Sequence, residues 1–197
     1  MNRFPIATLL ILTFCGCGVP NPPNRTWTYT EQKTYPDGII VTAVVKAEEW
    51  AQDAPPRTTR EYSVTFDGKT EVVGVFKGKI NRVLRTRDVL LLLAHVEFSI
   101  RSTDGAWRHV NAGATAELQQ QGIRFAVAEQ PLATQWKWLE IADVDPNERA
   151  VILRDRKGGA PFCISFDENG NNLEFKSRQE ANHAPEDTAR KLADPQH

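Results

Sequence analysis

Six consecutive apolar residues, Val89 to Ala94, constrain the fold of this chain more than any other segment. In a β-strand successive side chains point to opposite faces, so a strand with this sequence is apolar on both faces, as a central strand is. From His95 onward the sequence alternates instead, with Val96, Phe98 and Ile100 separated by polar residues. The segment therefore predicts the central part of a β-sheet core.

Alternating β-branched and aromatic residues recur from Arg25 to Phe175 and predict about nine short strands. Asp67-Gly68, between two such segments, is typical of a tight hairpin turn. Residues 115–121 predict a short helix with Thr115 as its N-cap. Many short strands with at most one or two short helices indicate an all-β fold, an antiparallel β-sandwich or open barrel.

Composition agrees with one globular domain, which we place at residues 26–175. Of the 197 residues, 41% are hydrophobic and 25% are charged, both ordinary values. A net charge of -1 argues against nucleic acid as a partner, because such binders need clustered Lys and Arg. Three cysteines are too few for a disulfide-stapled scaffold. The polar segment 176–197 is expected to be a disordered tail.

The start of the chain, MNRFPIATLLILTFCGC, has the features of an export signal. Arg3 and the amino terminus form a short cationic region, and an uncharged run follows from Phe4 to Phe14. As a helix this run is roughly 16 Å long, about half the thickness of the hydrocarbon layer of a bilayer. It is therefore too short for a stable transmembrane helix and has the length of a signal-peptide core.

This segment resembles the signal of bacterial lipoproteins, in which an aliphatic residue and two small residues precede a cysteine. Cys17 follows the small residue Gly16 and is the preferred lipidation site. Cys15 is the alternative, but the bulky Phe14 stands directly before it. An ordinary secretory signal with two incidental cysteines is the other interpretation.

The resemblance implies that residues 1–16 are removed and that the sulfur of Cys17 carries two acyl chains such as palmitate, which anchor the protein in a membrane. Gly18, rather than Asp, follows the cysteine, which in this family favours the outer membrane, with the domain facing the periplasm. Three prolines within residues 17–25 indicate an extended tether.

Candidate catalytic or metal-binding residues are few. Alternation places His95 and Glu97 on one strand face, and the next hairpin could bring His109 close to them. The favoured interpretation is a solvated polar face that these residues form with Ser99 and Arg101. A general acid–base site is the alternative. We expect no metal ion and no cofactor.

Two tryptophans suggest a binding surface. Trp136 and Trp138 are two positions apart in a predicted strand, so their indoles share a face and could form a flat platform for a sugar ring or a partner protein. The other interpretation is that both rings fill the core. Cys163, between Phe162 and Ile164, is expected to be a buried, unreactive thiol.

Together these features predict a lipid-anchored protein of the bacterial cell envelope. Its β-domain is expected to bind a partner protein or a cell-wall glycan without catalysis. The alternative is an envelope hydrolase that uses His95, Glu97 and His109.

Overall fold

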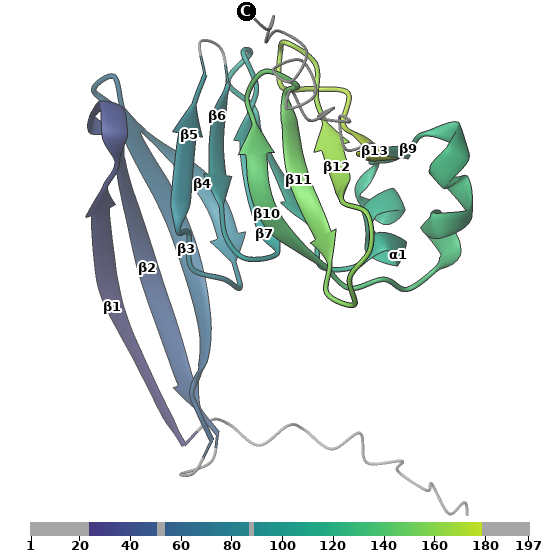
Figure 1. Ribbon diagram of the computed structural model, residues 1–197. Coiled ribbons are helices and arrows are strands. Elements are labelled where there is room, and N and C mark those ends of the chain that lie inside the picture. The colour runs from purple at the N-terminus through teal and green to yellow at the C-terminus, as the bar shows by residue number, and fades with distance from the viewer. Residues whose placement is uncertain (1–23, 51–53, 87–88, 179–197) are drawn as a thin grey trace, which may run out of the picture.

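The computed structural model describes residues 24–50, 54–86 and 89–178. Within them it shows an all-β sandwich of thirteen strands in three sheets, so the predicted fold class is confirmed, with more strands than the nine or so expected (Figure 1). Each sheet is built from one continuous stretch of sequence, and neighbouring strands pair antiparallel with one exception.

The first sheet has the order β1-β2-β3-β4. Its strands are β1 (Arg25–Thr34), β2 (Ile40–Glu49), β3 (Arg57–Phe66) and β4 (Lys69–Phe76). Asp67 and Gly68 form the predicted turn between β3 and β4, and their φ angles of 49° and 73° explain why Asp-Gly suits it. The short 3-10 helix η1 (Pro36–Gly38) connects β1 to β2.

The second sheet has the order β5-β6-β7-β8. Its strands are β5 (Arg82–Arg85), β6 (Leu90–Leu93), β7 (Glu97–Arg101) and β8 (Trp107–Asn111). All four are joined in sequence order and pair antiparallel.

The third sheet has the order β10-β11-β12-β13-β9. Its strands are β9 (Arg124–Phe125), β10 (Leu139–Asp145), β11 (Ala150–Asp155), β12 (Phe162–Ser165) and β13 (Glu174–Ser177). The two-residue strand β9 pairs parallel with β13 and is the exception to the antiparallel pattern.

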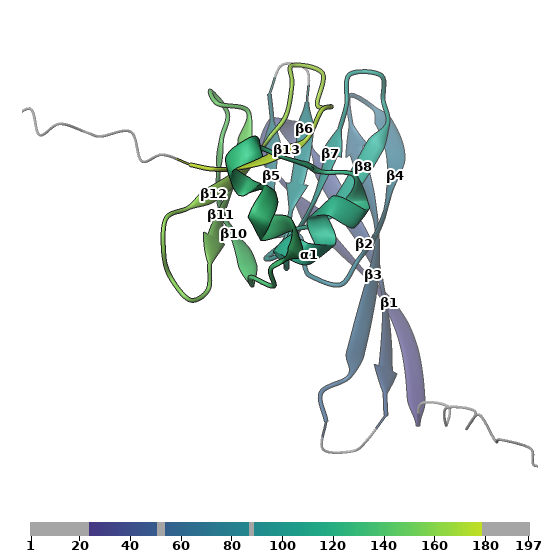
Figure 2. The same cartoon turned by 90° about the vertical axis from the view of Figure 1, so that its right-hand side faces the viewer.

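Helical segments close one side of the sandwich, beside β9 and β13 (Figure 1), and this side faces the viewer in Figure 2. They are α1 (Thr115–Leu118), η2 (Gln119–Gln121) and η3 (Val127–Thr134). The predicted helix is confirmed, but its N-cap is Ala114 and not Thr115. The Thr115 hydroxyl instead donates a hydrogen bond to the carbonyl of Gln135, which ties α1 to the end of η3.

The second sheet is the middle layer, because β6 is buried on both faces. Leu91 and Leu93 belong to a core cluster shared with the third sheet and the helices. Leu90 and Leu92 belong to a separate cluster shared with the first sheet. The two-sided apolar sequence of β6 is thus explained by a protein layer on each side of it.

Polar groups also connect the first two layers. The Arg101 guanidinium on β7 donates two hydrogen bonds, of 2.7 and 2.8 Å, to the two carboxylate oxygens of Glu71 on β4. The indole N–H of Trp107 donates to the same carboxylate at 2.9 Å. Arg101 holds the pKa of Glu71 below its usual value. Such a bidentate, charge-assisted contact sets how β4 lies across the middle sheet.

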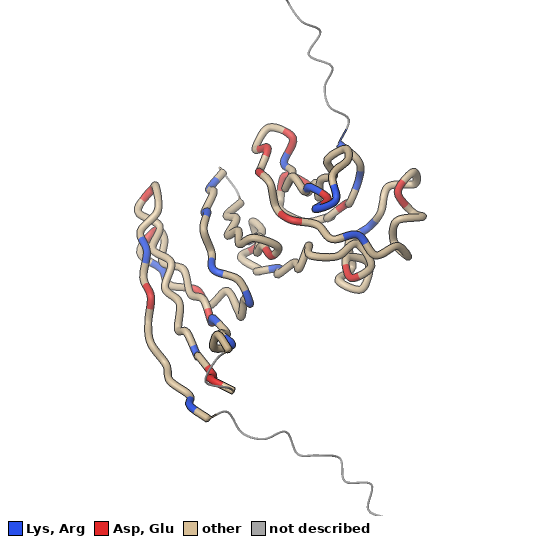
Figure 3. The backbone as a smooth tube through the Cα atoms, turned by 60° about the horizontal axis from the view of Figure 1, so that its bottom comes forward, with Lys and Arg blue, Asp and Glu red and all other residues tan. Residues whose placement is uncertain are grey.

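Basic and acidic residues are interspersed along all three sheets (Figure 3). The strands extend slightly beyond the domain predicted at 26–175, since β1 begins at Arg25 and β13 ends at Ser177. Arg178 then forms an ion pair of 2.7 Å with Asp145. The predicted signal peptide, most of the tether and most of the tail lie outside the described residues.

Truncation of neighbouring leucines tests the three-layer arrangement. We expect Leu91→Ala and Leu92→Ala each to lower the free energy of unfolding by roughly 2–5 kcal/mol, because both side chains are fully buried in different clusters. Denaturant unfolding measures both. Val72→Ala, at an exposed position, is the control and should change stability by less than about 0.5 kcal/mol. If either substitution lowers the free energy of unfolding only slightly, the face of β6 on which that leucine lies is not covered by a protein layer, which contradicts the arrangement.

Candidate functional site

A cavity of about 460 Å³ opens at the end of the sandwich where β6 turns into β7. Five separate stretches of sequence line it, including the loop after β4, the β6–β7 turn, the segment from β8 to α1, and the residues beside β10 and β11. Its lining residues are Lys77, Gly78, His95, Val96, Glu97, Asn111, Gly113, Ala114, Glu117, Trp138 and Arg156. We call this cavity the groove. It contains three residues that the sequence singled out: His95, Glu97 and Trp138.

Trp138 forms an aromatic wall of the groove. Its backbone is held by a β-bridge to Ala114 and by a 3.0 Å hydrogen bond from the N–H of Arg156 to its carbonyl. The side chain is 49% exposed, and that of Trp136 is 55% exposed, so neither ring fills the core. Both residues precede β10, which begins only at Leu139, so the predicted strand starts later than expected.

The two indoles do not form the flat platform that the sequence suggested. Their ring centroids are 5.5 Å apart and their planes meet at 75°, an edge-to-face contact. Such a contact supports the orientation of both rings while leaving the face of one of them free. Trp138 is the ring that lines the groove, with Trp136 packed against it.

His95 lies on the polar side of the groove. Its Nε2 is 3.4 Å from a carboxylate oxygen of Glu140 and 3.3 Å from the guanidinium of Arg156. Its carbonyl accepts a 2.8 Å hydrogen bond from the N–H of Ile141, which ties the β6–β7 turn to β10. These groups present donors and an acceptor to solvent beside Trp138.

Glu97 is a buried carboxylate at the wall of the groove. Its side chain is 3% exposed, and one oxygen accepts a 3.0 Å hydrogen bond from the backbone N–H of Lys77. The same oxygen is 3.8 Å from Nε2 of His109. Burial of a carboxylate without such partners is costly, so these two contacts account for its position between layers.

His109, whose side chain is 37% exposed, and the buried Ser99 continue this polar chain along the middle sheet. Ser99 Oγ is 3.2 Å from His109 Nδ1, and the His109 ring packs edge-on against Phe76 at 4.5 Å between centroids. Burial lowers the pKa of His109, and the nearby Glu97 partly opposes this shift. Ser99 is fully buried, so no substrate reaches its hydroxyl.

The solvated polar face predicted for β7 is therefore wrong. Glu97 and Ser99 are buried and Arg101 is largely covered, because this face packs on β4 of the first sheet. The polar side chains of this face are paired with groups at the first sheet, such as Glu71 and the N–H of Lys77, and with His109 of the neighbouring strand β8.

The structure also separates the three residues of the hydrolase alternative. Glu97 and His109 are in contact, whereas His95 contacts Glu140 and Arg156. Among the residues that the structure describes, no three His, Cys, Asp or Glu side chains gather closely enough to hold a metal ion. Arg156, Glu140 and Glu117 were not anticipated from sequence, because no local motif links them to His95.

Of the cysteines, Cys163 is buried in β12 as expected, and this burial raises the pKa of its thiol. Cys15 and Cys17 lie outside the described residues.

No protein-family model matches this chain. Neither a curated protein nor a solved structure matches it. In the described part of the chain, no helix has the length and apolar character needed to cross a membrane.

The lowered pKa of His109 predicts a pH dependence of stability. Between pH 6.5 and this lower pKa, the His109 imidazole is protonated in the unfolded chain and neutral in the folded protein. Stability is therefore lost as the pH falls through this range. We expect His109→Gln to flatten the fall in melting temperature as the pH is lowered below about 6.5. The same substitution at the exposed His95 is the control, and a flatter profile in that variant alone contradicts the assignment.

Proposed function

We propose that this chain is a non-catalytic binding protein of the bacterial cell envelope, anchored through a lipid on Cys17, whose groove binds a cell-wall glycan. The observation that carries the proposal is the half-exposed Trp138, which forms one wall of the groove beside side chains of both charges.

The chemistry of the groove suits a sugar. A sugar ring has an apolar C–H face and an edge of hydroxyl groups, so it needs an apolar surface beside hydrogen-bonding groups. The Trp138 indole supplies a rigid apolar surface. Asn111, Glu117 and Arg156 supply donors and acceptors around it. A few polar groups placed around an aromatic wall are typical of small-molecule sites.

A glycan fits better than a partner protein as the ligand of this site. The groove is a cavity of about 460 Å³, within the range typical of small-ligand pockets. The exposed aromatic surface beside it is confined to Trp136 and Trp138.

The proposed anchor fits the same role. Seven residues separate Cys17 from the start of β1 at Arg25, so the two residues are eight steps apart, a reach of at most about 28 Å for an extended chain. An acylated Cys17 thus holds the β-domain close to the membrane surface, where envelope glycans lie.

Binding is favoured over hydrolysis by the arrangement of the polar residues. A catalytic serine must be open to the substrate, and Ser99 is fully buried beside His109. His95 is exposed but belongs to a different set of contacts, with Glu140 and Arg156. Glu97 and His109 are better explained as neighbouring polar residues of the middle sheet, on the face that packs against the first sheet.

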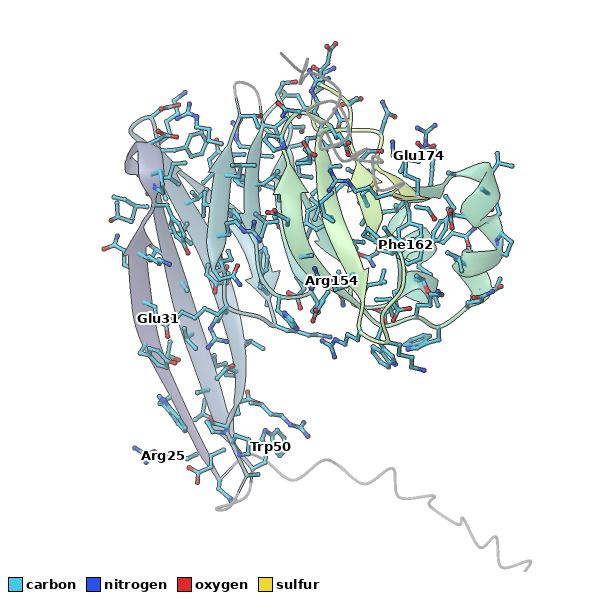
Figure 4. All side chains as sticks on the ribbon, in the orientation of Figure 1. Arg25, Glu31, Trp50, Arg154, Phe162 and Glu174 are labelled. Carbon is cyan, nitrogen blue, oxygen red and sulfur yellow. The ribbon has the colours of Figure 1, made fainter. Side chains whose placement is uncertain are left out.

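Removal of the Trp138 indole should weaken glycan binding. We expect Trp138→Ala to raise the dissociation constant for soluble peptidoglycan fragments by about tenfold or more, equivalent to about 1.4 kcal/mol, as measured by isothermal titration calorimetry. Trp50→Ala is a matched control, because Trp50 is also exposed and lies at the far end of the first sheet (Figure 4). Equal loss in both variants, or no binding by the unchanged protein, contradicts the glycan site.

Metabolic labelling with palmitate tests the anchor. We expect the unchanged chain to incorporate label and Cys17→Ala to lose it, because the cysteine sulfur carries the acyl chains. Cys15→Ala is the control and should retain label. Loss in Cys15→Ala with labelling kept in Cys17→Ala means that Cys15 is the acylated residue, and absence of label in the unchanged chain rejects the lipoprotein assignment.

A further inference from the structure

The outer edge of the first sheet is a surface that glycan binding does not use. β1 is ten residues long, pairs with β2 in an unbroken register, and forms one end of the strand order. The other edge strands are protected: β4 and β10 contain register shifts, and β5, β8 and β9 have four, five and two residues. A long regular edge is a template for pairing with another strand.

The hydrogen bonds of β1 show which backbone groups are free for such pairing. The N–H of Tyr35, directly after β1, donates to the carbonyl of its partner Ile39 at 2.8 Å. Backbone groups alternate in direction along a strand, so the odd-numbered residues of β1 face β2. Thr26, Thr28 and Thr30 therefore direct their N–H and C=O groups toward the open side, where no strand pairs in the described structure (Figure 1).

We propose that two copies of this chain pair antiparallel through β1, about a twofold axis at Thr28. In this register Thr28 faces Thr28 of the second copy, and Thr26 faces its Thr30. These are the residues whose backbone groups are free, so each pair can exchange two hydrogen bonds. The result is one continuous sheet across the dimer with an isologous interface.

The side chains of β1 are complementary in this register. Arg25 lies opposite Glu31 of the second copy, and Trp27 lies opposite its Tyr29. Both are non-hydrogen-bonded pairs, whose Cα atoms are only about 4.5 Å apart and whose side chains interact most closely. Because the dimer has a twofold axis, each of these two pairs occurs twice in it. Figure 4 shows Arg25 at the free end of β1 and Glu31 further along it, as this arrangement requires.

The neighbouring register with its axis at Tyr29 is unfavourable. An axis at Tyr29 also pairs the free backbone groups, but it places Arg25 opposite Lys33, and two like charges face each other at both ends. Only the Thr28 axis gives opposite charges at the ends and an aromatic pair beside the centre.

A second copy suits this edge better than an unrelated peptide. Pairing about a twofold axis requires a sequence that is complementary to its own reverse, and Arg25 to Glu31 has this property. Tyr29, which is 40% exposed in the single chain, is covered by Trp27 of the second copy.

Sedimentation velocity of the full-length chain in detergent tests the dimer. We expect the unchanged protein to form a dimer, and Arg25→Glu to raise its dissociation constant about tenfold because Glu31 then faces a like charge. The double variant Arg25→Glu/Glu31→Arg should restore dimerisation. Lys33→Glu is the control and should leave it unchanged. A monomer at every concentration overturns the proposal, as does a tighter dimer in Lys33→Glu, which indicates the Tyr29 register.

Single cysteines locate the axis directly. Thr28→Cys should form an intermolecular disulfide under mild oxidation, because the two Cα atoms of a hydrogen-bonded pair are about 5.5 Å apart. Gln32→Cys is the matched control, since its two copies are roughly 27 Å apart in this register. The unchanged chain gives the background from its own cysteines. Cross-linking of Gln32→Cys, or none of Thr28→Cys beyond background, overturns the arrangement.

Discussion

The structure depends on the burial of β6 from both sides. Leu90 to Leu93 are all buried, and adjacent residues belong to different hydrophobic clusters. One short strand thus requires two further protein layers, and the first and third sheets supply them. The groove is a consequence of this arrangement, because its His95 lies in the turn between β6 and β7 and its Glu97 begins β7, where edges of the layers come together.

The contact between the first two sheets differs from an ordinary apolar interface because it contains polar groups in the middle. Glu71 and Arg101 connect one layer to the other, and Glu97, which lies beside His109 in the middle sheet, accepts a hydrogen bond from the N–H of Lys77 after β4. Paired buried charges contribute little net stability, since desolvation offsets most of their attraction. Their stronger effect is on geometry: the bidentate contact of Arg101 with Glu71 favours one position of β4 over the middle sheet.

Much of the fold could be predicted from the sequence, since alternation and turn chemistry are local signals. The two-sided burial of β6, the Asp67-Gly68 hairpin and the buried Cys163 are confirmed. The environment of Glu97 and Ser99 was predicted wrongly, because alternation shows that a face is polar but not whether water or another polar layer covers it. The setting of β4 against this face depends on contacts far apart in sequence.

The candidate site was less predictable for a similar reason. The position of Trp138 depends on its bridge to Ala114, and that of His95 on contacts with Glu140 and Arg156. None of these partners is close in sequence to the residue that it positions. Residue types could therefore nominate Trp138, His95 and Glu97, but only the folded chain brings them to one groove.

The order of the layers along the chain has a consequence for folding during synthesis. The first, second and third sheets come from successive segments, and only the two-residue β9 departs from its place in sequence order. When the amino-terminal part of the chain emerges first, the middle sheet can pack on the first sheet at once. Leu91 and Leu93 then remain exposed until β11 and β12 arrive. The half-assembled protein carries an uncovered leucine surface during this interval, which is the stage at which a chaperone has most to protect.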